Sequence, residues 1–506
     1  MADLLIDQLR IMADHLPDKV AYVQVAADTS ITFADWDTES DRLAGALVDA
    51  GVAKGDRVAV YLPPEEALEW MISYSAVHKA GAVAVPVNTR LAPRELEEIL
   101  TPSGAVAALT GAGTTEVLHG VRSALPALGW AATTVSDPPD GFLPWREVSG
   151  SPGRVQVPID GDDMADIVYT SGTTGRAKGV VVRHHNAATI PNGLPNWTGD
   201  GWLHASPLFT FAGIASVYNP MKLGMTGLYQ PRFEAGEWLS QAERRRPAAV
   251  FLVPSMAQLL VAHPRFDDAD LSSILLASLG SAPVAPETLR RLQDRMPHAW
   301  VSNNWGMTEA GSAFCMLPPE ETAKRIGSVG KPVPPVTFRI VEDDGNELGP
   351  REVGELLVCN PGKEREYFND EEATSATWRD GWLHTGDLAY LDEDGYLYIV
   401  GRKKDVIIRG GNNIYATDVE SVLMEYDGIQ EAAVVGVPHA VLGEDVAAWI
   451  VPRPGMELNL EKLRSFLAER LSDYKTPRQI TVVEDLPRNA TGKVLKRLLV
   501  DASPQP

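Results

Sequence analysis

Asp166–Gly179 reads Asp-Ile-Val-Tyr-Thr-Ser-Gly-Thr-Thr-Gly-Arg-Ala-Lys-Gly. The apolar run Ile167–Tyr169 predicts a strand that leads into a loop of hydroxyl and glycine residues, and Val180–Val182 predicts the strand that leaves it. Glycines in such a loop allow backbone amides to point inward at an anion, which a Cβ would obstruct. The pattern therefore predicts a loop that holds a polyphosphate.

The polar residues of this loop offer hydroxyls, backbone amides and one mobile ammonium group to an anion. They are Thr170, Ser171, Gly172, Thr173, Thr174, Gly175 and Lys178. An ordinary turn between two strands rarely gathers so many of these groups, although Ser, Thr and Gly are common in turns. The loop is not of the GxxxxGK[ST] type, because no Gly-Lys-Ser/Thr triplet follows at the required spacing.

Tyr169–Gly179 resembles the phosphate-binding signature of the adenylate-forming superfamily. That superfamily contains acyl-CoA synthetases, stand-alone adenylation domains and firefly-type luciferases. The resemblance extends over nearly the whole chain through the motifs below. It implies ATP or AMP, Mg²⁺ and coenzyme A as cofactors, and it implies that Thr170 takes part in catalysis and in holding the metal ion.

A second motif, Asn303–Glu309, reads Asn-Asn-Trp-Gly-Met-Thr-Glu. An aromatic ring can lie against a purine, and a carboxylate is a ligand that Mg²⁺ prefers. In the family this segment is aromatic-Gly-x-Thr-Glu, which implies that Trp305 stacks on adenine, Thr308 contacts phosphate, and Glu309 is catalytic and holds the metal. The resemblance adds the neighbouring loops to the nucleotide site, through Gly280, Ser281, Ala282, Asn304, Gly306 and Met307.

Charged residues near the end of the chain complete the expected site. A carboxylate can accept hydrogen bonds from both ribose hydroxyls, so Asp387, after a tight turn, is the ribose candidate. The resemblance assigns Arg402 to ribose and phosphate and Lys404 to a hinge. It places Gly410 and Gly411 in a loop that lines the pantetheine tunnel.

Pro487–Lys493 matches the final signature of the family. Lys493 is implied as the catalytic residue of the first half-reaction, where it pairs with the substrate carboxylate and the α-phosphate. A small domain cannot present Lys493 and the Gly410–Gly411 loop to one site at once. It is therefore expected to rotate between adenylation and thioester formation.

The predicted fold class is α/β. Helical and strand signals alternate over residues 31–110, with Thr32 as an N-cap and Gly51 as a stop, and this alternation predicts a doubly wound sheet with parallel strands. Residues 111–165 are expected to be irregular surface connections. Residues 1–401 are predicted to form a large domain with a β-rich subdomain at roughly 328–400, and residues 402–506 a small mobile α+β domain.

Composition excludes some partners. The chain has 506 residues, of which 44% are hydrophobic, and a formal charge of −23, which argues against nucleic acid or an anionic membrane surface as a partner. Cys315 and Cys359 lie outside any Cys-x-x-Cys or Cys/His cluster, so buried free thiols are expected. No apolar run reaches 18 residues, and the predicted location is the cytoplasm.

The acyl pocket is expected around Thr210, Phe211, Gly213, Gly280 and Gly306. Two residues depart from the family pattern. Thr210 stands where many acyl-CoA synthetases have histidine, and Asn304 stands where glycine is usual. Both changes touch the nucleotide side, so one hypothesis is a ligase that favours a bulky or preformed acyl-adenylate.

The leading prediction is an AMP-forming acid:CoA ligase whose partners are a carboxylic acid, ATP and CoA. A stand-alone enzyme that loads the phosphopantetheine of an acyl carrier protein shares these motifs, as does a ligase specialised for thioester formation. A luciferase-like oxygenase and a non-catalytic binding homologue are weaker alternatives. The sequence leaves open a homodimer and the choice among fatty, aryl and polycyclic acids.

Overall fold

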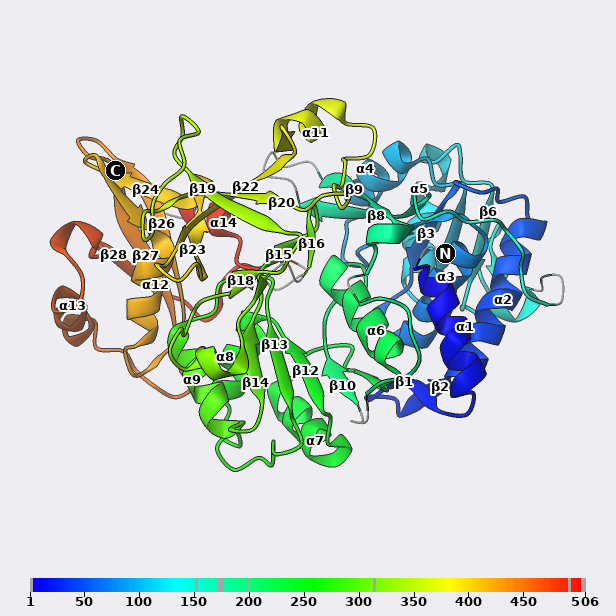
Figure 1. Ribbon diagram of the computed structural model, residues 1–506, viewed down its shortest axis with the longest axis horizontal. Coiled ribbons are helices and arrows are strands. Elements are labelled where there is room, and N and C mark those ends of the chain that lie inside the picture. Colours follow the sequence, from blue (N-terminus) through cyan, green and yellow to red (C-terminus); the bar gives the residue numbers. More distant parts are fainter. Residues whose placement is uncertain are drawn as a thin grey trace.

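The computed structural model describes residues 3–148, 150, 153–171, 177–188, 190–197, 201–312, 315–489 and 493–501. The fold is α/β, with a large N-terminal domain and a small C-terminal domain, which confirms the predicted class. Figure 1 shows the C-terminal strands on the side of the molecule away from the N-terminus.

The first seven-stranded sheet has the order β7-β6-β5-β3-β4-β8-β9. Its strands are β3 Arg57–Tyr61, β4 Val83–Pro86, β5 Ala107–Thr110, β6 Trp130–Thr133, β7 Leu143–Pro144, β8 Met164–Ser171 and β9 Ala177–Arg183. Strands β3 to β8 pair in parallel, and β9 returns antiparallel to β8. Helices α4 (Pro93–Ser103) and α5 (Thr114–Val121) contribute to the core on one face of this sheet.

The prediction for residues 111–165 was wrong in part. This region contributes α5 and β6, and Ala131 and Ala132 in β6 are fully buried in the sheet. Strand β6 has only four residues, and its apolar run Trp130–Ala132 is too short to show a period. The Pro and Gly breaks in this region mark only the loops that connect these elements.

The second seven-stranded sheet has the order β14-β13-β12-β10-β11-β1-β2. Its strands are β1 Val20–Gln24, β2 Thr29–Thr32, β10 Trp202–His204, β11 Gly227–Tyr229, β12 Ala249–Leu252, β13 Leu276–Leu279 and β14 Trp300–Asn303. Helices on one face share its hydrophobic core, and they are α7 Ala235–Arg245, α8 Pro254–Ala262 and α9 Pro286–Arg295.

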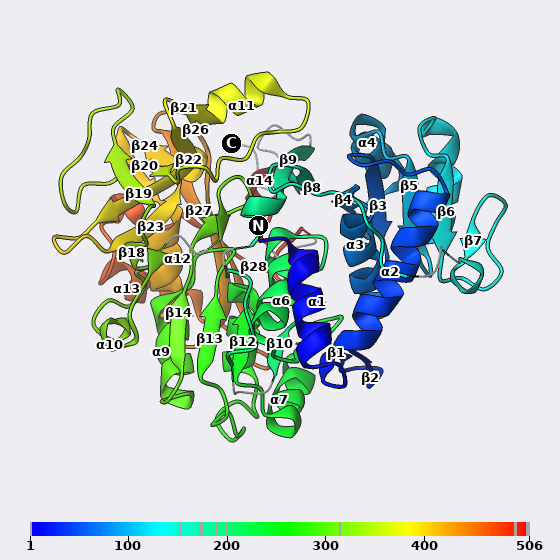
Figure 2. The ribbon, with the colours of Figure 1, turned by 45° about the vertical axis from the view of Figure 1, so that its right-hand side comes forward.

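A helical layer lies between the two large sheets, as Figure 2 shows. Its helices are α1 Leu5–His15, α2 Phe33–Asp49, α3 Ala67–Lys79 and α6 Phe211–Leu223. Their apolar faces form one continuous core with residues from both sheets. As predicted, Thr32 caps α2, because its side chain accepts a hydrogen bond from the Asp35 amide at 3.1 Å.

The rest of the chain is rich in antiparallel strands. One five-stranded sheet contains β19 Thr337–Val341, β20 Gly354–Cys359, β21 Trp378–Arg379, β22 Trp382–Leu391 and β23 Leu397–Arg402. The other contains β24 Val406–Arg409, β25 Asn412–Tyr415, β26 Ile429–His439, β27 Gly443–Pro452 and β28 Gln479–Val482, with helices α12 Ala416–Met424, α13 Leu460–Ala468 and α14 Lys496–Asp501.

Both cysteines are free, as predicted, but only Cys315 is buried, and Cys359 is half-buried. Among the helices of the described ranges, none is both long enough and apolar enough to span a bilayer.

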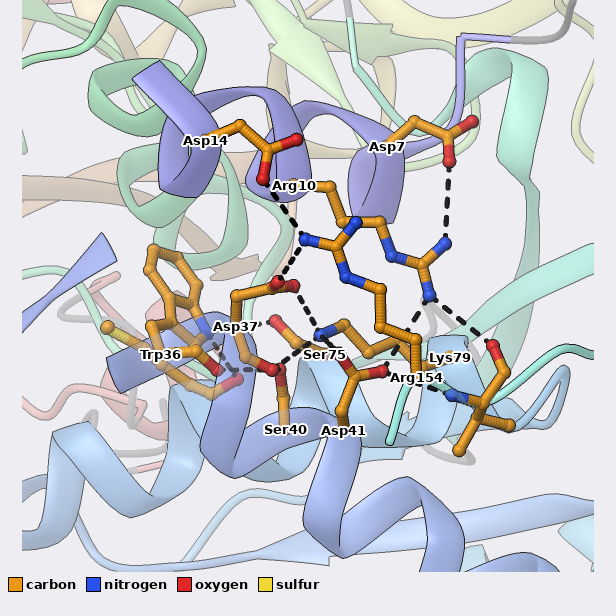
Figure 3. Close-up of polar contacts among 12 residues, drawn as sticks. Asp7, Arg10, Asp14, Trp36, Asp37, Ser40, Asp41, Ser75, Lys79 and Arg154 are labelled. Atoms are coloured by element: carbon orange, nitrogen blue, oxygen red, sulfur yellow. Dashed lines mark hydrogen bonds and ion pairs between the residues drawn. The ribbon is translucent and has the colours of Figure 1, made fainter. Parts of the chain in front are cut away.

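A buried ion cluster joins the N-terminal helices (Figure 3). The ammonium group of Lys79 is 2.6 Å from Asp37 Oδ1 and 3.1 Å from Asp41 Oδ2, and its side chain is fully buried. Arg154 bridges Asp37 and Asp14 at 3.3 and 3.2 Å, which links α1 to α2. Burial lowers the pKa of Lys79, and the two carboxylates oppose that shift. The cluster therefore fixes α3 against α2 through paired charges.

We expect Lys79→Met to lower the free energy of unfolding by about 3–5 kcal/mol, because two buried carboxylates lose their buried cation and keep only the longer contacts with Arg154 and Arg10. Urea unfolding followed by circular dichroism measures this change. The matched control is Lys324→Met, whose ammonium pairs with Glu321 at 3.1 Å on an exposed side chain, and it should cost less than about 1 kcal/mol. Equal losses for both variants would contradict the role given to the cluster.

Candidate active site

The β8–β9 hairpin carries the predicted phosphate loop. Thr170 lies opposite Lys178 at the loop end of the hairpin, and Tyr169 lies opposite Gly179. Gly172, Thr173, Thr174 and Gly175 lie outside the described residues, as does the side chain of Ser171. The described strands thus bring the ends of the loop together, and the roles of its residues stay predictions.

Asp387 brings together three of the predicted residues. The indole N–H of Trp305 donates to Asp387 Oδ2 at 2.9 Å, and Arg402 Nε lies 2.6 Å from Oδ1. Burial raises the pKa of Asp387, while Arg402 and Trp305 act to lower it. Each carboxylate oxygen therefore already has a donor, which fixes its direction.

Trp305 is more deeply buried than an open stacking platform would be. Only 9% of its surface is accessible, and its ring meets the edge of Phe338 at a centroid distance of 6.5 Å. The adjacent Gly306 and Met307 form the short strand β15 (Gly306–Met307), where Gly306 is exposed. Stacking of Trp305 on adenine stays a prediction.

Lys493 approaches the Asp387 group from the C-terminal domain. Surrounding protein atoms lower the pKa of Lys493, Arg402 lowers it further, and Asp387 acts in the opposite direction. The side chain nevertheless remains solvent-accessible. The Lys493 amide donates to Asn489 Oδ1 at 2.9 Å. Lys493 is therefore placed where a polyphosphate or carboxylate near Asp387 would meet it.

The other predicted elements of the C-terminal domain lie in two turns, and Lys404 is near enough to Lys493 to lower its pKa. Gly410 and Gly411 form the β24–β25 turn, with φ of 57° and 85°, and the Gly410 amide donates to the Leu442 carbonyl at 2.8 Å. Lys404 is exposed in the short turn that follows β23. The structure thus places Lys493 near enough to act on the pKa of Asp387, whereas the glycine turn packs against Leu442.

Glu309 is held by a residue that the motifs did not reveal. The Tyr367 hydroxyl donates to Glu309 Oε1 at 2.9 Å, and burial followed by the nearby Glu309 raises the pKa of Tyr367. The phenol therefore stays protonated and remains a donor. Within the described ranges, Oε2 of Glu309 accepts no hydrogen bond.

A carboxylate oxygen that accepts no hydrogen bond from the described residues fits Mg²⁺, which is often held by one or two carboxylates together with substrate phosphates. No group of three or more His, Cys, Asp or Glu side chains in the described part of the chain is arranged to hold a metal ion by itself. The site therefore suits a metal ion that arrives with a nucleotide.

The predicted acyl residues surround the start of α6 and the end of β13. Thr210 caps α6, because its hydroxyl accepts from the Gly213 amide at 3.0 Å and donates to the Pro207 carbonyl at 2.7 Å. A Cβ on Gly213 would lie 2.0 Å from the Pro207 oxygen, so the loop requires glycine there. Thr210 therefore has a structural role as the N-cap of α6, which is independent of any effect on adenylation.

Gly280 and Asn304 meet at the opposite side of this region. A Cβ on Gly280 would lie 3.2 Å from the Asn304 carbonyl oxygen. The Asn304 amide donates to Ser278 Oγ at 2.9 Å, so its side chain is bound to β13. Ser281 has a φ of 76°, a strained value for a residue other than glycine, and such strain often marks functional loops. Ala282 follows it half-buried.

Arg365 is the second residue that the motifs missed. It is buried, its guanidinium lies 4.6 Å from the centre of the Phe211 ring, and Nη1 donates to the Thr308 carbonyl at 2.8 Å. Burial lowers its pKa to about 10. The spacing of Arg365 and Tyr367 was the only signal in the sequence, and it is too common to identify a site.

Comparisons with known proteins agree with the motifs. The model of the AMP-binding enzyme family matches residues 9–368, and that of the AMP-binding enzyme C-terminal domain matches residues 418–493. A feruloyl-CoA synthase from Amycolatopsis sp is 37% identical over 473 residues, which cover 92% of this chain and 93% of the relative. The long-chain-fatty-acid–CoA ligase FadD13 of Mycobacterium tuberculosis H37Rv is 32% identical over 508 residues and 97% of each chain.

Among solved structures, the anthranilate CoA ligase AuaEII in complex with anthranoyl-AMP superposes with a TM-score of 0.88. It is 26% identical in sequence, and the match covers 99% of this chain and 97% of that one.

We expect Trp305→Phe to lower the free energy of unfolding by about 1–3 kcal/mol, because the buried Asp387 carboxylate loses a donor. Chemical denaturation at neutral pH measures the loss. Trp382→Phe is the matched control, since Trp382 is half-buried and packs under Arg339 at 4.4 Å. A loss no larger than that of the control would rule out a stabilising bond between Trp305 and Asp387.

Proposed function

This chain belongs to the AMP-binding enzyme family, and from that membership we propose that it is an AMP-forming acid:CoA ligase. It activates a carboxylic acid with ATP as an acyl-adenylate and then transfers the acyl group to the thiol of CoA. The observation that carries the proposal is the pairing of Trp305 and Arg402 with Asp387, with Lys493 near enough to act on the pKa of that carboxylate.

In the first half-reaction, the carboxylate oxygen attacks the α-phosphate of ATP, and pyrophosphate leaves. The protein has to position two anions and balance their charge, with little covalent work of its own. Asp387 accepts from the ribose hydroxyls, Arg402 holds Asp387 and reaches ribose or phosphate, and Lys493 pairs with the carboxylate and the α-phosphate. Thr308, Lys178 and the hydroxyls of the phosphate loop bind the phosphates.

Glu309 and Thr170 are the residues that would hold Mg²⁺. The metal ion would neutralise phosphate charge and help to orient the leaving pyrophosphate. Tyr367 holds the Glu309 carboxylate in place through its hydrogen bond to Oε1.

In the second half-reaction, the thiolate of CoA attacks the acyl carbon and AMP leaves. We propose that the C-terminal domain first rotates about Lys404, which withdraws Lys493 and brings the Gly410–Gly411 turn to the site. The turn is exposed to solvent, so a rotation of the domain can present it to the site. Hinges of this kind absorb large changes at a few residues.

The acid is proposed to lie beside Phe211, Gly213 and Gly280. The relatives are named for ferulate, long-chain fatty acids and anthranilate, so aryl and fatty acids are the first candidates. A carrier-protein thiol is the competing acceptor. Specialisation for thioester formation has less support, because Thr210 serves as a helix cap and Asn304 is bound to β13.

Pyrophosphate release with ATP, Mg²⁺ and a panel of aryl, fatty and polycyclic acids, with and without CoA, tests the proposal. Acid-dependent release followed by acyl-CoA formation supports it. Transfer of the acyl group to a phosphopantetheinylated carrier protein and not to CoA would favour the competing acceptor. Acyl-CoA formed only from a supplied acyl-adenylate would point to the specialised ligase.

We expect Lys493→Ala to lower the rate of adenylation by about 10²–10³, as for the loss of one donor at a developing charge. Thioester formation from a supplied acyl-adenylate should keep its rate, because Lys493 serves only the first step. Arg497→Gln, an exposed change on α14, is the control and should leave both rates unchanged. A parallel loss of both steps in Lys493→Ala would contradict the division of roles.

The pH profile gives an independent check on Lys493. Its protonated form is the active one, so kcat/KM for adenylation should be full below its pKa and fall as pH rises through it. Because surrounding protein atoms and Arg402 lower that pKa, the fall should begin below the range of an ordinary lysine. Lys493→Arg should remove this fall. An unchanged alkaline limb in Lys493→Arg would assign the titration to another group.

A further inference from the structure

An extended segment, Arg365–Phe368, runs along the free edge of β9. The Val181 amide donates to the Glu366 carbonyl at 2.9 Å, and the Phe368 amide donates to the Gly179 carbonyl at 2.8 Å. Tyr367 forms an antiparallel bridge with Val180. The segment therefore acts as an additional edge strand of the sheet that carries the phosphate loop.

Side chains alternate along an extended segment, so Arg365 and Tyr367 point to the same side. Glu366 points to the other side, where it is exposed and pairs with Arg183 at 2.5 Å. The two residues on the inner side reach consecutive residues of the motif after β14. Arg365 Nη1 donates to the Thr308 carbonyl at 2.8 Å, and the Tyr367 hydroxyl donates to Glu309 Oε1 at 2.9 Å.

Each of these side chains also contacts a second part of the site. The Arg365 guanidinium covers Phe211 at 4.6 Å, and its Nη2 donates to the Asn186 carbonyl. The ammonium group of Lys178 lies 5.0 Å from the centre of the Tyr367 ring. Arg365 and Tyr367 together thus contact three parts of the candidate site. These are Phe211 in the acyl region, Lys178 in the β8–β9 hairpin, and the Thr308–Glu309 motif.

The surroundings of Arg365 are unusual for a residue that serves stability alone. A buried charge normally has an ion pair, because desolvation is costly. Within the described ranges, Arg365 forms no ion pair, and its buried Nε has no acceptor. Backbone carbonyls and an aromatic face are its partners, which suits a group that must fix the position of a loop.

We propose that Arg365 and Tyr367 form a clamp of positioning residues that orients Thr308 and Glu309 toward the metal-bound nucleotide. The clamp also connects that motif to Phe211 in the acyl region. The inference rests on the proposed function for the meaning of the motif. Its physical basis is general: partners that hydrogen-bond a metal-binding carboxylate fix its orientation.

Tyr367→Phe tests the clamp with the loss of one hydroxyl and no change in the backbone pairing of the segment. Calorimetric titration of the full chain with ATP, once with Mg²⁺ and once with EDTA, separates metal-dependent from metal-free binding. We expect the gain in affinity that Mg²⁺ provides to fall by about 10- to 100-fold, with metal-free binding unchanged. Tyr390→Phe is the matched control, because Tyr390 stacks on Tyr398 at 4.9 Å in the β22–β23 pair.

Arg365→Lys keeps the positive charge but cannot reach two carbonyls with a planar fork. We expect it to weaken Mg²⁺-dependent binding and to raise KM for the acid, whereas Tyr367→Phe should leave that KM unchanged. Equal Mg²⁺-dependent binding in wild type, Tyr367→Phe and Arg365→Lys would overturn the clamp, as would wild-type binding that Mg²⁺ does not strengthen.

These outcomes are separable from failure of the proposed function. Titration with ATP requires no acid and no CoA, so it decides the clamp even if no acid in the panel releases pyrophosphate. Acid-dependent pyrophosphate release with unchanged titrations would leave the ligase proposal in place and remove the clamp.

Discussion

The buried carboxylate of Asp387 is the constraint on which the site depends. A carboxylate in a low-dielectric interior must be paired, and here the partners are Trp305 after β14 and Arg402 at the end of β23. Satisfying one charge therefore brings together the second large sheet, the β-rich subdomain and the approach to the C-terminal domain. Lys493 extends this set from the last domain and lies near enough to affect the pKa of Asp387.

The two large sheets position the phosphate hairpin, Thr308 and Glu309 at the carboxyl ends of their strands. The phosphate hairpin continues β8 beyond its carboxyl end, and Thr308 and Glu309 follow the carboxyl end of β14. Ligands of doubly wound sheets bind at such ends. The Arg365–Phe368 segment then extends the sheet of the hairpin and carries two side chains across to the motif after β14. One sheet edge thereby fixes residues that lie just beyond β14 of the other sheet.

Prediction of structural features from the sequence succeeded where neighbouring residues determine the feature. It failed where packing between distant segments determines the feature. Thr32 could be recognised as an N-cap, because a hydroxyl before an amphipathic run satisfies a free amide of the first turn. Strand β6 was missed, because its four residues become a strand only when α5 and the neighbouring strands bury them. Cys359 was expected to be buried, yet the end of β20 leaves it half-buried.

The sequence by itself determined the fold class, the hairpin that carries the phosphate loop and the identity of the motifs, because each of these depends on residue types at short spacing. Only the tertiary structure decided that Trp305 donates to Asp387, that Thr210 is a helix cap, and that Arg365 and Tyr367 hold Thr308 and Glu309. These contacts join segments that lie 57 to 82 residues apart, apart from the local cap. No spacing rule covers such distances, since burial and backbone pairing choose which side chains meet.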